Sequence, residues 1–119
     1  MRANKGESYR LRLVKAAIDT NWKYMTDDHT LTVIAMDLVP IQPYTTRFEN
    51  IGMGQRYDVI VTADQASVAR DFWIRAVPQT QCSENDNVNN IKDILHYHAQ
   101  IGIPKRMLHF STMAASMKV

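Results

Sequence analysis

The sequence contains a single cysteine, Cys82, among 119 residues. One cysteine cannot form an internal disulfide, so Cys82 is either a reduced thiol or half of a bridge whose partner lies outside this sequence. Glycine is also scarce, at four residues, and Gly52-Met53-Gly54 is too short, with no helix after it, to form a phosphate-binding loop. A chain of this length can bury the core of one domain without disulfides, and one domain is the expectation.

Long apolar runs and a concentration of one charge are also missing. No run approaches the ~20 apolar residues that cross a bilayer, and Met1 to Ser8 has no apolar segment behind it that resembles a signal peptide. The 14 basic and 12 acidic residues are scattered along the chain, whereas a nucleic-acid binder concentrates basic residues on one face. We therefore expect no membrane and no nucleic-acid partner.

Apolar and polar residues alternate with period two along much of the chain, which is typical of half-buried strands. No segment shows a convincing amphipathic helix. About seven short strands with turn residues between them predict an all-β, two-sheet sandwich of Greek-key type. The predicted strands are residues 9–13, 22–26, 31–36, 45–50, 56–62, 71–77 and 91–98.

The connections between these strands carry further expectations. The two strands on either side of the turn-favouring segment Asp27–Thr30 are predicted to form a hairpin. Pro40 and Pro43 exclude a central strand, so residues 38–44 are predicted to cross irregularly. Residues 99–119 follow neither a helical nor a strand period, and we expect an irregular, weakly ordered tail.

One pair of histidines, His96 and His98, occupies alternate positions of the last predicted strand. Alternate strand residues share a face, and two imidazoles about 7 Å apart at Cα can bind one metal ion. A complete copper or zinc shell needs more ligands, however, and His29 and His109 lie in a turn and in the tail. We interpret the pair as a solvated pair on an edge strand.

Other candidate residues have ordinary structural interpretations. Cys82 could be a copper thiolate, but it lies in a polar loop without the two nearby histidines that such a centre needs. Asp19 ends an apolar run and suits a turn-forming carboxylate. Phe72, Trp73 and Tyr57 are interpreted as core or half-core aromatics of facing strands. The residues alone assemble no catalytic triad.

Four segments, taken together and in order, resemble the central, plastocyanin-like domain of three-domain fungal laccases of the ascomycete type, which are multicopper oxidases. The resemblance covers Gly6 to Tyr97, and its combination of motifs is more specific than any single string. The segments are YRLRLVKAAIDTN (9–21), DHTLTVIAMDLVPIQPYTT (28–46), IGMGQRYDVIVTADQA (51–66) and FWIRAVPQT (72–80).

The resemblance implies a cupredoxin-type sandwich over residues 6–98 that binds no copper of its own, followed by a non-homologous tail over 99–119. In such oxidases copper is held by the first and third domains, and the enzyme oxidises phenols or aromatic amines while reducing O₂ to water. The middle domain packs between these flanking cupredoxin domains and lines the phenol pocket. The family is extracellular. We expect no oxidase activity from this chain alone.

The resemblance also assigns roles to individual residues. Asp19 matches the pocket carboxylate that accepts a hydrogen bond from the phenolic hydroxyl and helps to remove its proton. Pro78, Gln79 and Thr80 match the loop on the other side of the pocket. Cys82 matches a cysteine that is bridged to a downstream residue in ascomycete members, but no downstream cysteine exists here.

The chain also departs from the family. Family members usually carry Asn at the position of Lys15 and often carry Asn at the position of Asp28. Both changes are expected to be tolerated on a surface. After Tyr97 the family continues into a linker to its third domain, while this sequence differs, which indicates a fragment or truncated gene model. The alternative hypothesis is a stand-alone β-sandwich binding or structural module without catalysis.

Overall fold

The computed structural model describes residues 1–81, 90–98 and 116–117, the last two by their backbone alone. Every regular element in these residues is a β-strand, so they include no helix that could span a membrane. The strands are β1 (Arg2–Asn4), β2 (Ser8–Val14), β3 (Trp22–Thr26), β4 (Leu31–Met36), β5 (Val39–Thr46), β6 (Glu49–Ile51), β7 (Arg56–Thr62), β8 (Asp71–Pro78), β9 (Lys92–His98) and β10 (Ser116–Met117).

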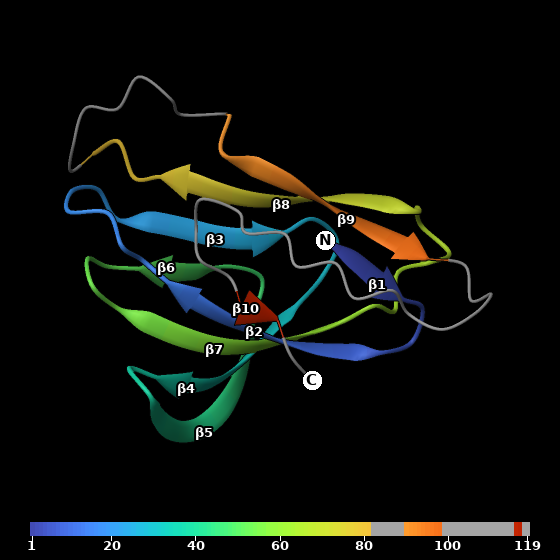
Figure 1. Cartoon of the computed structure of the whole chain (residues 1–119), viewed down its shortest axis with the longest axis horizontal. Coiled ribbons are helices and arrows are strands. Elements are labelled where there is room, and N and C mark those ends of the chain that lie inside the picture. The colour runs from blue at the N-terminus through green and yellow to red at the C-terminus, as the bar shows by residue number, and fades with distance from the viewer. Residues whose placement is uncertain (82–89, 99–115, 118–119) are drawn as a thin grey trace.

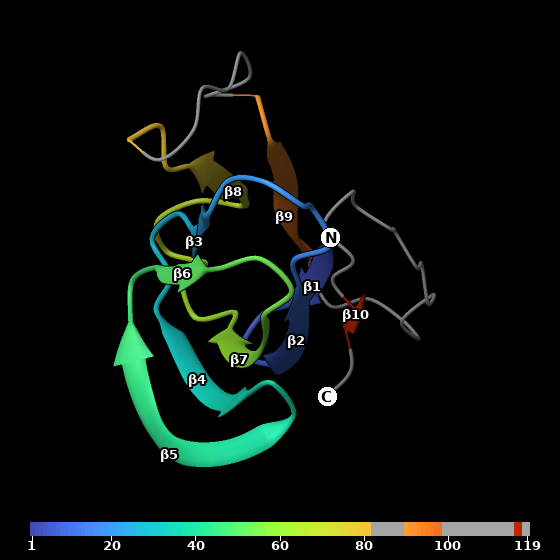
Figure 2. The same cartoon turned by 90° about the vertical axis from the view of Figure 1, so that its left-hand side faces the viewer.

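The strands form two five-stranded sheets that face each other (Figure 1). One sheet has the order β1-β9-β8-β3-β6, and the other has the order β10-β2-β7-β4-β5. Within the described residues, β1 and β9 are parallel and all other pairs are antiparallel. Figure 2 shows the β4–β5 hairpin curling away at the end of the molecule opposite β8 and β9. The predicted all-β sandwich is confirmed.

The alternation of the sequence explains which faces are buried. Tyr57, Val59 and Val61 on β7 are at most 5% exposed and pack between the sheets with Leu11 and Leu13 of β2. Full burial of such a side chain contributes roughly 1.5–3 kcal/mol, which is what selects this register over a one-residue slip. The main core therefore comprises the nine buried residues Leu11, Leu13, Tyr24, Leu31, Val33, Ile51, Tyr57, Val59 and Val61.

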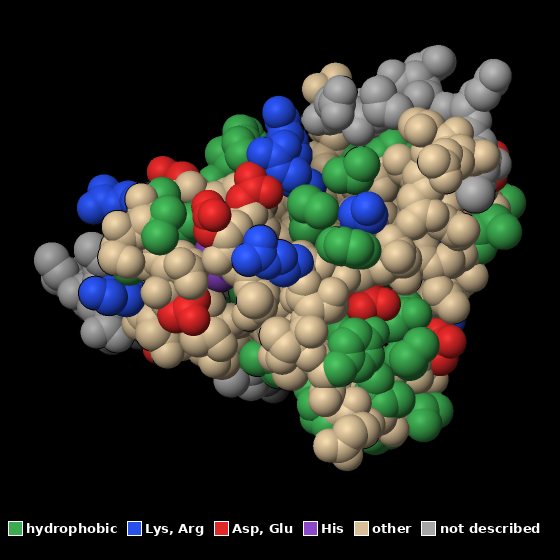
Figure 3. All heavy atoms as spheres, turned by 180° about the vertical axis from the view of Figure 1, so that it is seen from behind, with side chains coloured by type: hydrophobic (Ala, Val, Ile, Leu, Met, Phe, Trp, Pro, Cys, Tyr) green, Lys and Arg blue, Asp and Glu red, His purple; other side chains and the backbone are tan. Residues whose placement is uncertain are grey.

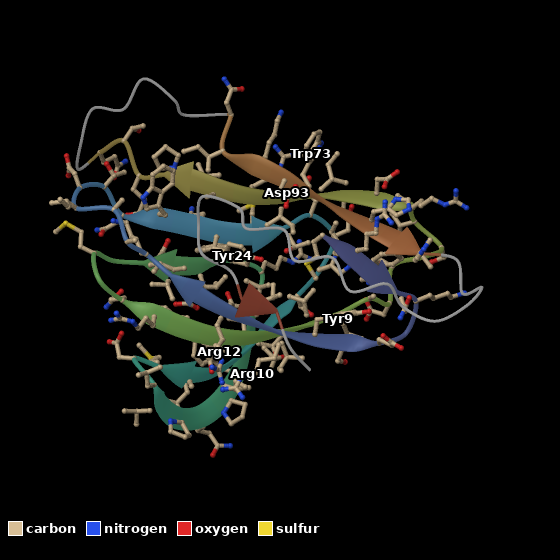
Figure 4. All side chains as sticks on the ribbon, viewed as in Figure 1. Tyr9, Arg10, Arg12, Tyr24, Trp73 and Asp93 are labelled. Carbon is tan, nitrogen blue, oxygen red and sulfur yellow. The ribbon has the colours of Figure 1, made fainter. Side chains whose placement is uncertain are left out.

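A smaller core closes one end of the sandwich. It joins Ala3, Ala63, Phe72, Leu95 and Tyr97, contributed by β1, β8, β9 and the segment after β7. Phe72 lies on the inward face of β8 and belongs to this core, whereas the next residue, Trp73, points outward. Two of the predicted core aromatics are thus fully buried, while the third, Trp73, lies on the outer face at 38% exposure beside Lys92 (Figure 4).

The predicted hairpin across Asp27–Thr30 is wrong. β3 pairs with β6 and β8 in one sheet, whereas β4 pairs with β5 and β7 in the other. The turn residues therefore cross between the sheets. The reason is that both strands carry a row of apolar side chains, and the two rows bury each other best when they face across the core.

The expected irregular crossing of residues 38–44 is also wrong, because residues 39–44 belong to β5 and Leu38 lies in the turn before it. Pro40 and Pro43 are compatible with this strand because β5 lies at the sheet edge and pairs on one side alone with β4, as far as the described residues show. Predicted strand 45–50 is divided between the end of β5 and β6. In the tail, Ser116 and Met117 pair with β2, and the rest of 99–119 lies outside the described residues.

One carboxylate, Asp58, is buried on the outer side of β7. Arg10 donates to it from β2, and the guanidinium of Arg12 lies 3.8 Å from the same oxygen. A buried carboxylate without a partner would be costly, so these arginines explain how it is tolerated. The predicted outward direction of Arg10 and Arg12 is confirmed, and Figure 4 shows both on β2.

Candidate functional site

Asp19 lies in the connection between β2 and β3, as the sequence predicts for a turn carboxylate. The residue is exposed, and its Oδ1 accepts a hydrogen bond of 2.7 Å from the backbone N–H of Thr20. Thr20 has a φ of 68°, a left-handed conformation that makes the chain turn sharply into β3. A carboxylate has about four acceptor sites, so an exposed Asp19 can accept a further hydrogen bond from a ligand.

The loop that carries Asp19 is held by a buried lysine. Lys15 is 6% exposed, and its ammonium group donates to the carbonyls of Ala17 at 3.0 Å and Asp19 at 3.1 Å. Its backbone N–H donates to the carbonyl of Gln55, so two loops meet at this residue. The expectation that Lys15 is a surface position is wrong, because its loop folds back over the side chain and uses the ammonium as an internal donor. Asp28, by contrast, is exposed as expected.

The second predicted segment, Pro78-Gln79-Thr80, follows directly at the end of β8. The start of β3 and the end of β8 lie on the same side of the sandwich (Figure 1), because Trp22 pairs with Pro78 in antiparallel register. The backbone N–H of Gln79 then donates to the carbonyl of Asn21 at 2.9 Å. Its side-chain amide donates to Asn50 Oδ1 at 2.7 Å. The fold therefore brings both predicted pocket segments to one rim.

At the opposite end of β3, a buried histidine connects neighbouring strands through its hydrogen bonds. The sequence predicts only a turn position for this residue. His29 is 4% exposed, its Nδ1 lies 2.7 Å from the carbonyl of Asp27, and its Nε2 is hydrogen-bonded to the hydroxyl of Tyr97. The ring of Phe72 packs edge-on at 4.7 Å between centroids. The Tyr97 hydroxyl also accepts the N–H of Gln65 at 3.2 Å. Burial raises the pKa of Tyr97, so its neutral form is favoured.

The same end carries a fork-shaped ion pair. Arg75 on β8 donates to both carboxylate oxygens of Asp27 at 2.8–3.1 Å. These hydrogen bonds raise the pKa of the guanidinium, although the side chain of each partner is about a third exposed. A hollow of about 410 Å³ opens here against residues 25–30, Arg47, Phe48 and Gln65, away from Asp19. The hollow thus lies at the Asp27 end of β3, and the predicted pocket segments lie at the Asp19 end.

The histidine pair His96 and His98 lies on β9, which has β1 on one side and β8 on the other, so the expected edge position is wrong. The short N-terminal strand β1 gave no clear alternation, which is why the sequence did not reveal it. His96 Nδ1 lies 2.5 Å from Asp71 Oδ1, and the two imidazole centroids are 6.2 Å apart.

A metal ion needs a closed group of ligands. Within residues 1–81, 90–98 and 116–117, no three His, Cys, Asp or Glu side chains come together in a way that could hold one. His29 has both ring nitrogens engaged, and His96 is held by Asp71. The described donors therefore do not fit a copper centre. Cys82 lies outside the described residues.

Two face-to-face sheets with an apolar core between them define a β-sandwich, and the match to laccase structures identifies it as the cupredoxin type. The chain belongs to the multicopper oxidase family, whose model, described as "Multicopper oxidase", matches residues 1–100.

Curated relatives place the chain among fungal laccases. It is 53% identical over 93 residues to Laccase-2 of Botryotinia fuckeliana, covering 78% of this chain and 16% of the relative. It is 48% identical over 96 residues to Oxidoreductase OpS5 of Beauveria bassiana, covering 81% and 16%. The crystal structure of the laccase from Botrytis aclada matches with a TM-score of 0.77 and 44% identity, over 94% of this chain and 21% of that one. The chain thus spans about a sixth of the length of these curated relatives.

Proposed function

We propose that this chain is the middle domain of a laccase-like oxidase and forms one wall of the pocket in which a phenol or aromatic amine is oxidised. The match of residues 1–100 to the multicopper oxidase family and the similarity to fungal laccases support the class of reaction. In this family the electron acceptor is copper, and the resemblance assigns the copper ligands to the domains that flank this one. The parent enzyme would reduce O₂ to water and be exported from the fungus.

The observation that carries the pocket assignment is the hydrogen bond from Gln79 to Asn21. It aligns the loop of Asp19 with the loop of Pro78, Gln79 and Thr80, which the resemblance assigns to opposite sides of one pocket. Asp19 and Thr80 are exposed and Gln79 is half-buried, whereas Thr20 and Pro78 are buried. A phenol bound between them would meet an exposed carboxylate and the polar residues Gln79 and Thr80 that follow β8.

The chemistry follows from that carboxylate. A phenol that gives up one electron becomes strongly acidic, and its hydroxyl proton must leave to an acceptor. Asp19 would accept the hydrogen bond and then the proton, while the electron leaves for the copper held by the rest of the enzyme. Positioned proton transfer of this kind contributes about 10² to 10⁴-fold to a rate.

The test is Asp19→Asn in an oxidase that carries this domain, assayed with a phenol and with a non-phenolic one-electron donor. The substitution preserves size and removes the proton acceptor, so kcat/KM for the phenol should fall ~10² to 10⁴-fold, with an altered pH profile. The non-phenolic donor should be oxidised at the original rate.

The matched control is Asp64→Asn, since Asp64 is an exposed aspartate whose Oδ1, like that of Asp19, accepts a hydrogen bond from the next residue, and the substitution creates no Asn-x-Ser/Thr glycosylation site. This variant should oxidise both donors normally. Equal losses with both donors in Asp19→Asn would contradict the role of Asp19, because they indicate a change in folding or in redox potential.

A further inference from the structure

The loop that carries Asp19 exposes a run of apolar side chains. Ala16, Ala17 and Ile18 are all exposed, and Ile18 is 90% exposed, the highest value of any large apolar side chain that the structure describes. The carbonyls of Ala17 and Asp19 accept hydrogen bonds from the buried Lys15, so the main chain of the loop faces inward and these side chains face solvent. Three exposed apolar residues in succession are unfavourable on a surface unless they serve a function.

A second loop, residues 52–55 between β6 and β7, lies against the first. The backbone N–H of Lys15 donates to the carbonyl of Gln55 at 3.2 Å. A Cβ atom added to Gly52 would lie 3.6 Å from Oδ1 of Asn21, so Gly52 is directly beside this residue. Figure 1 shows both loops at the left-hand end of the molecule, together with the end of β8, and Figure 2 faces this end. The rim of the predicted pocket therefore has a third segment.

Met53 lies at the tip of this second loop, on a fixed main chain. The N–H of Gly52 donates to Oε1 of Gln55 at 2.7 Å, and the N–H of Gln55 donates to the carbonyl of Gly52 at 3.2 Å. Gly54 has a φ of 69°, a left-handed conformation that glycine adopts without strain. The Met53 side chain itself is 60% exposed. A flexible, polarisable thioether on a fixed turn is suited to contact with aromatic rings of different shapes.

The exposed apolar residues of the two loops accompany a single charge. Asp19 is the one charged side chain in residues 16–21 and 52–54. Figure 3, a view from behind, shows apolar side chains exposed at its right-hand end, which is this end of the molecule. An apolar protein surface that covered these loops would bury the carboxylate of Asp19 without a partner, which is costly. A phenol fits both features, because its hydroxyl can donate to Asp19 while its ring covers the apolar side chains.

We propose that Ile18 and Met53 contact the ring of the phenol whose hydroxyl binds Asp19, and that they select phenols with an apolar substituent next to the hydroxyl. The inference rests on the proposed function, in which Asp19 accepts the phenolic proton. Ile18 directly precedes Asp19 and the loop of Met53 adjoins the Asp19 loop, so the ring positions next to the hydroxyl lie nearest to these two side chains. Apolar contacts of this kind strengthen binding equally before and during the reaction, and they therefore act on KM and leave kcat nearly unchanged.

The experiment compares kcat/KM for 2-tert-butylphenol and for unsubstituted phenol in the native full-length oxidase that carries this domain. Ile18→Thr and Met53→Gln nearly preserve the size of each side chain and make it polar. Each should reduce the preference for the substituted phenol about three- to tenfold through KM, because an open rim contributes less than the roughly 10- to 200-fold of one methylene in a closed apolar pocket. The apolar counterparts Ile18→Val and Met53→Leu should retain most of the preference.

Val68→Thr is the matched control, because Val68 is 60% exposed and lies between β7 and β8, at the end of β7 away from Met53. It should leave the preference unchanged. An unchanged preference in either polar variant, or an equal loss for both phenols, would overturn the proposal. If a polar variant does not fold, Ile18→Ala or Met53→Ala tests the same contact. None of these results alters the comparison of donors in Asp19→Asn, so failure of the inference and failure of the proposed function are distinguishable.

Discussion

The two ends of β3 are held in different ways. At the end near His29, side chains from β8 and β9 interlock through aromatic packing, a buried hydrogen bond and the Arg75–Asp27 pair. At the end near Asp19, the loop of Asp19 is held through its main-chain groups, with Lys15 as the buried donor. Side-chain interlocking leaves little freedom, while main-chain contacts leave the Asp19 side chain available. The difference indicates that one end mainly stabilises the fold and that the other can present functional groups.

The largest expected effect comes from removing the aromatic centre of the His29 end. Phe72→Ala should lower the free energy of unfolding by about 3–5 kcal/mol, because Phe72 is 4% exposed and packs on both His29 and Tyr97. Urea unfolding of the chain measures this loss. Trp73→Ala is the neighbouring control on the outer face, and its loss should be clearly smaller. Comparable losses would mean that the His29 end is not the stabilising one.

A smaller effect is expected from one hydroxyl at the same end. Tyr97→Phe leaves His29 Nε2 and the N–H of Gln65 without this partner, and buried unpaired groups cost roughly 1–3 kcal/mol. The loss should appear as a lower urea midpoint with an unchanged slope. Tyr9→Phe is the control, because the Tyr9 hydroxyl bonds to Asn4 and Glu7 near the surface. A loss no greater than that of the control would show that the Tyr97 hydroxyl is not needed.

The smallest effect on stability is expected at the Asp19 end. Lys15→Met retains the buried stem and removes both hydrogen bonds to the loop, whose carbonyls can turn to water, so the cost should be about 1 kcal/mol or less. Hydrogen exchange of the amides in residues 16–21 should nevertheless accelerate, while the exchange of β7 stays slow. Lys92→Met, which removes an exposed ammonium over Trp73, should leave the loop unchanged. Loop exchange that is also unchanged in Lys15→Met would show that the lysine does not hold Asp19.

The sequence predicts those features of the fold that depend on residues close together within one strand. The alternation of Tyr57, Val59 and Val61 is enough to assign a buried face, because period two is a local property. It does not predict which strands pair, and so the local pattern favours a hairpin at Asp27–Thr30, where the chain in fact crosses between the sheets. Short β1 and proline-containing β5 have weak local signals and owe their structure to β9 and β4.

The candidate site shows the same limit. Asp19 and the end of β8 are found by resemblance, but their proximity depends on the register of Trp22 with Pro78, across more than fifty residues. The sequence predicts a surface position for Lys15 and a turn for His29, because charged and polar residues are usually exposed. Their burial comes from loops and aromatics that are distant in sequence. A lysine at a strand end before the small residues Ala16 and Ala17 is the only local hint of its donor role.

The parallel pairing of β1 with β9 also sets the order in which the domain can be made. Met1 bonds to Ile94 across 93 positions, so the first strand waits for its partner until nearly the whole domain has been synthesised. Contacts between such distant residues slow folding, typically to milliseconds or longer. Until β9 leaves the ribosome, Leu95 and Tyr97 are absent from the smaller core, so Phe72 has His29 beside it but lacks Tyr97. A nascent chain that ends after β8 is therefore an incomplete sandwich with exposed apolar surface, the kind of intermediate that chaperones bind.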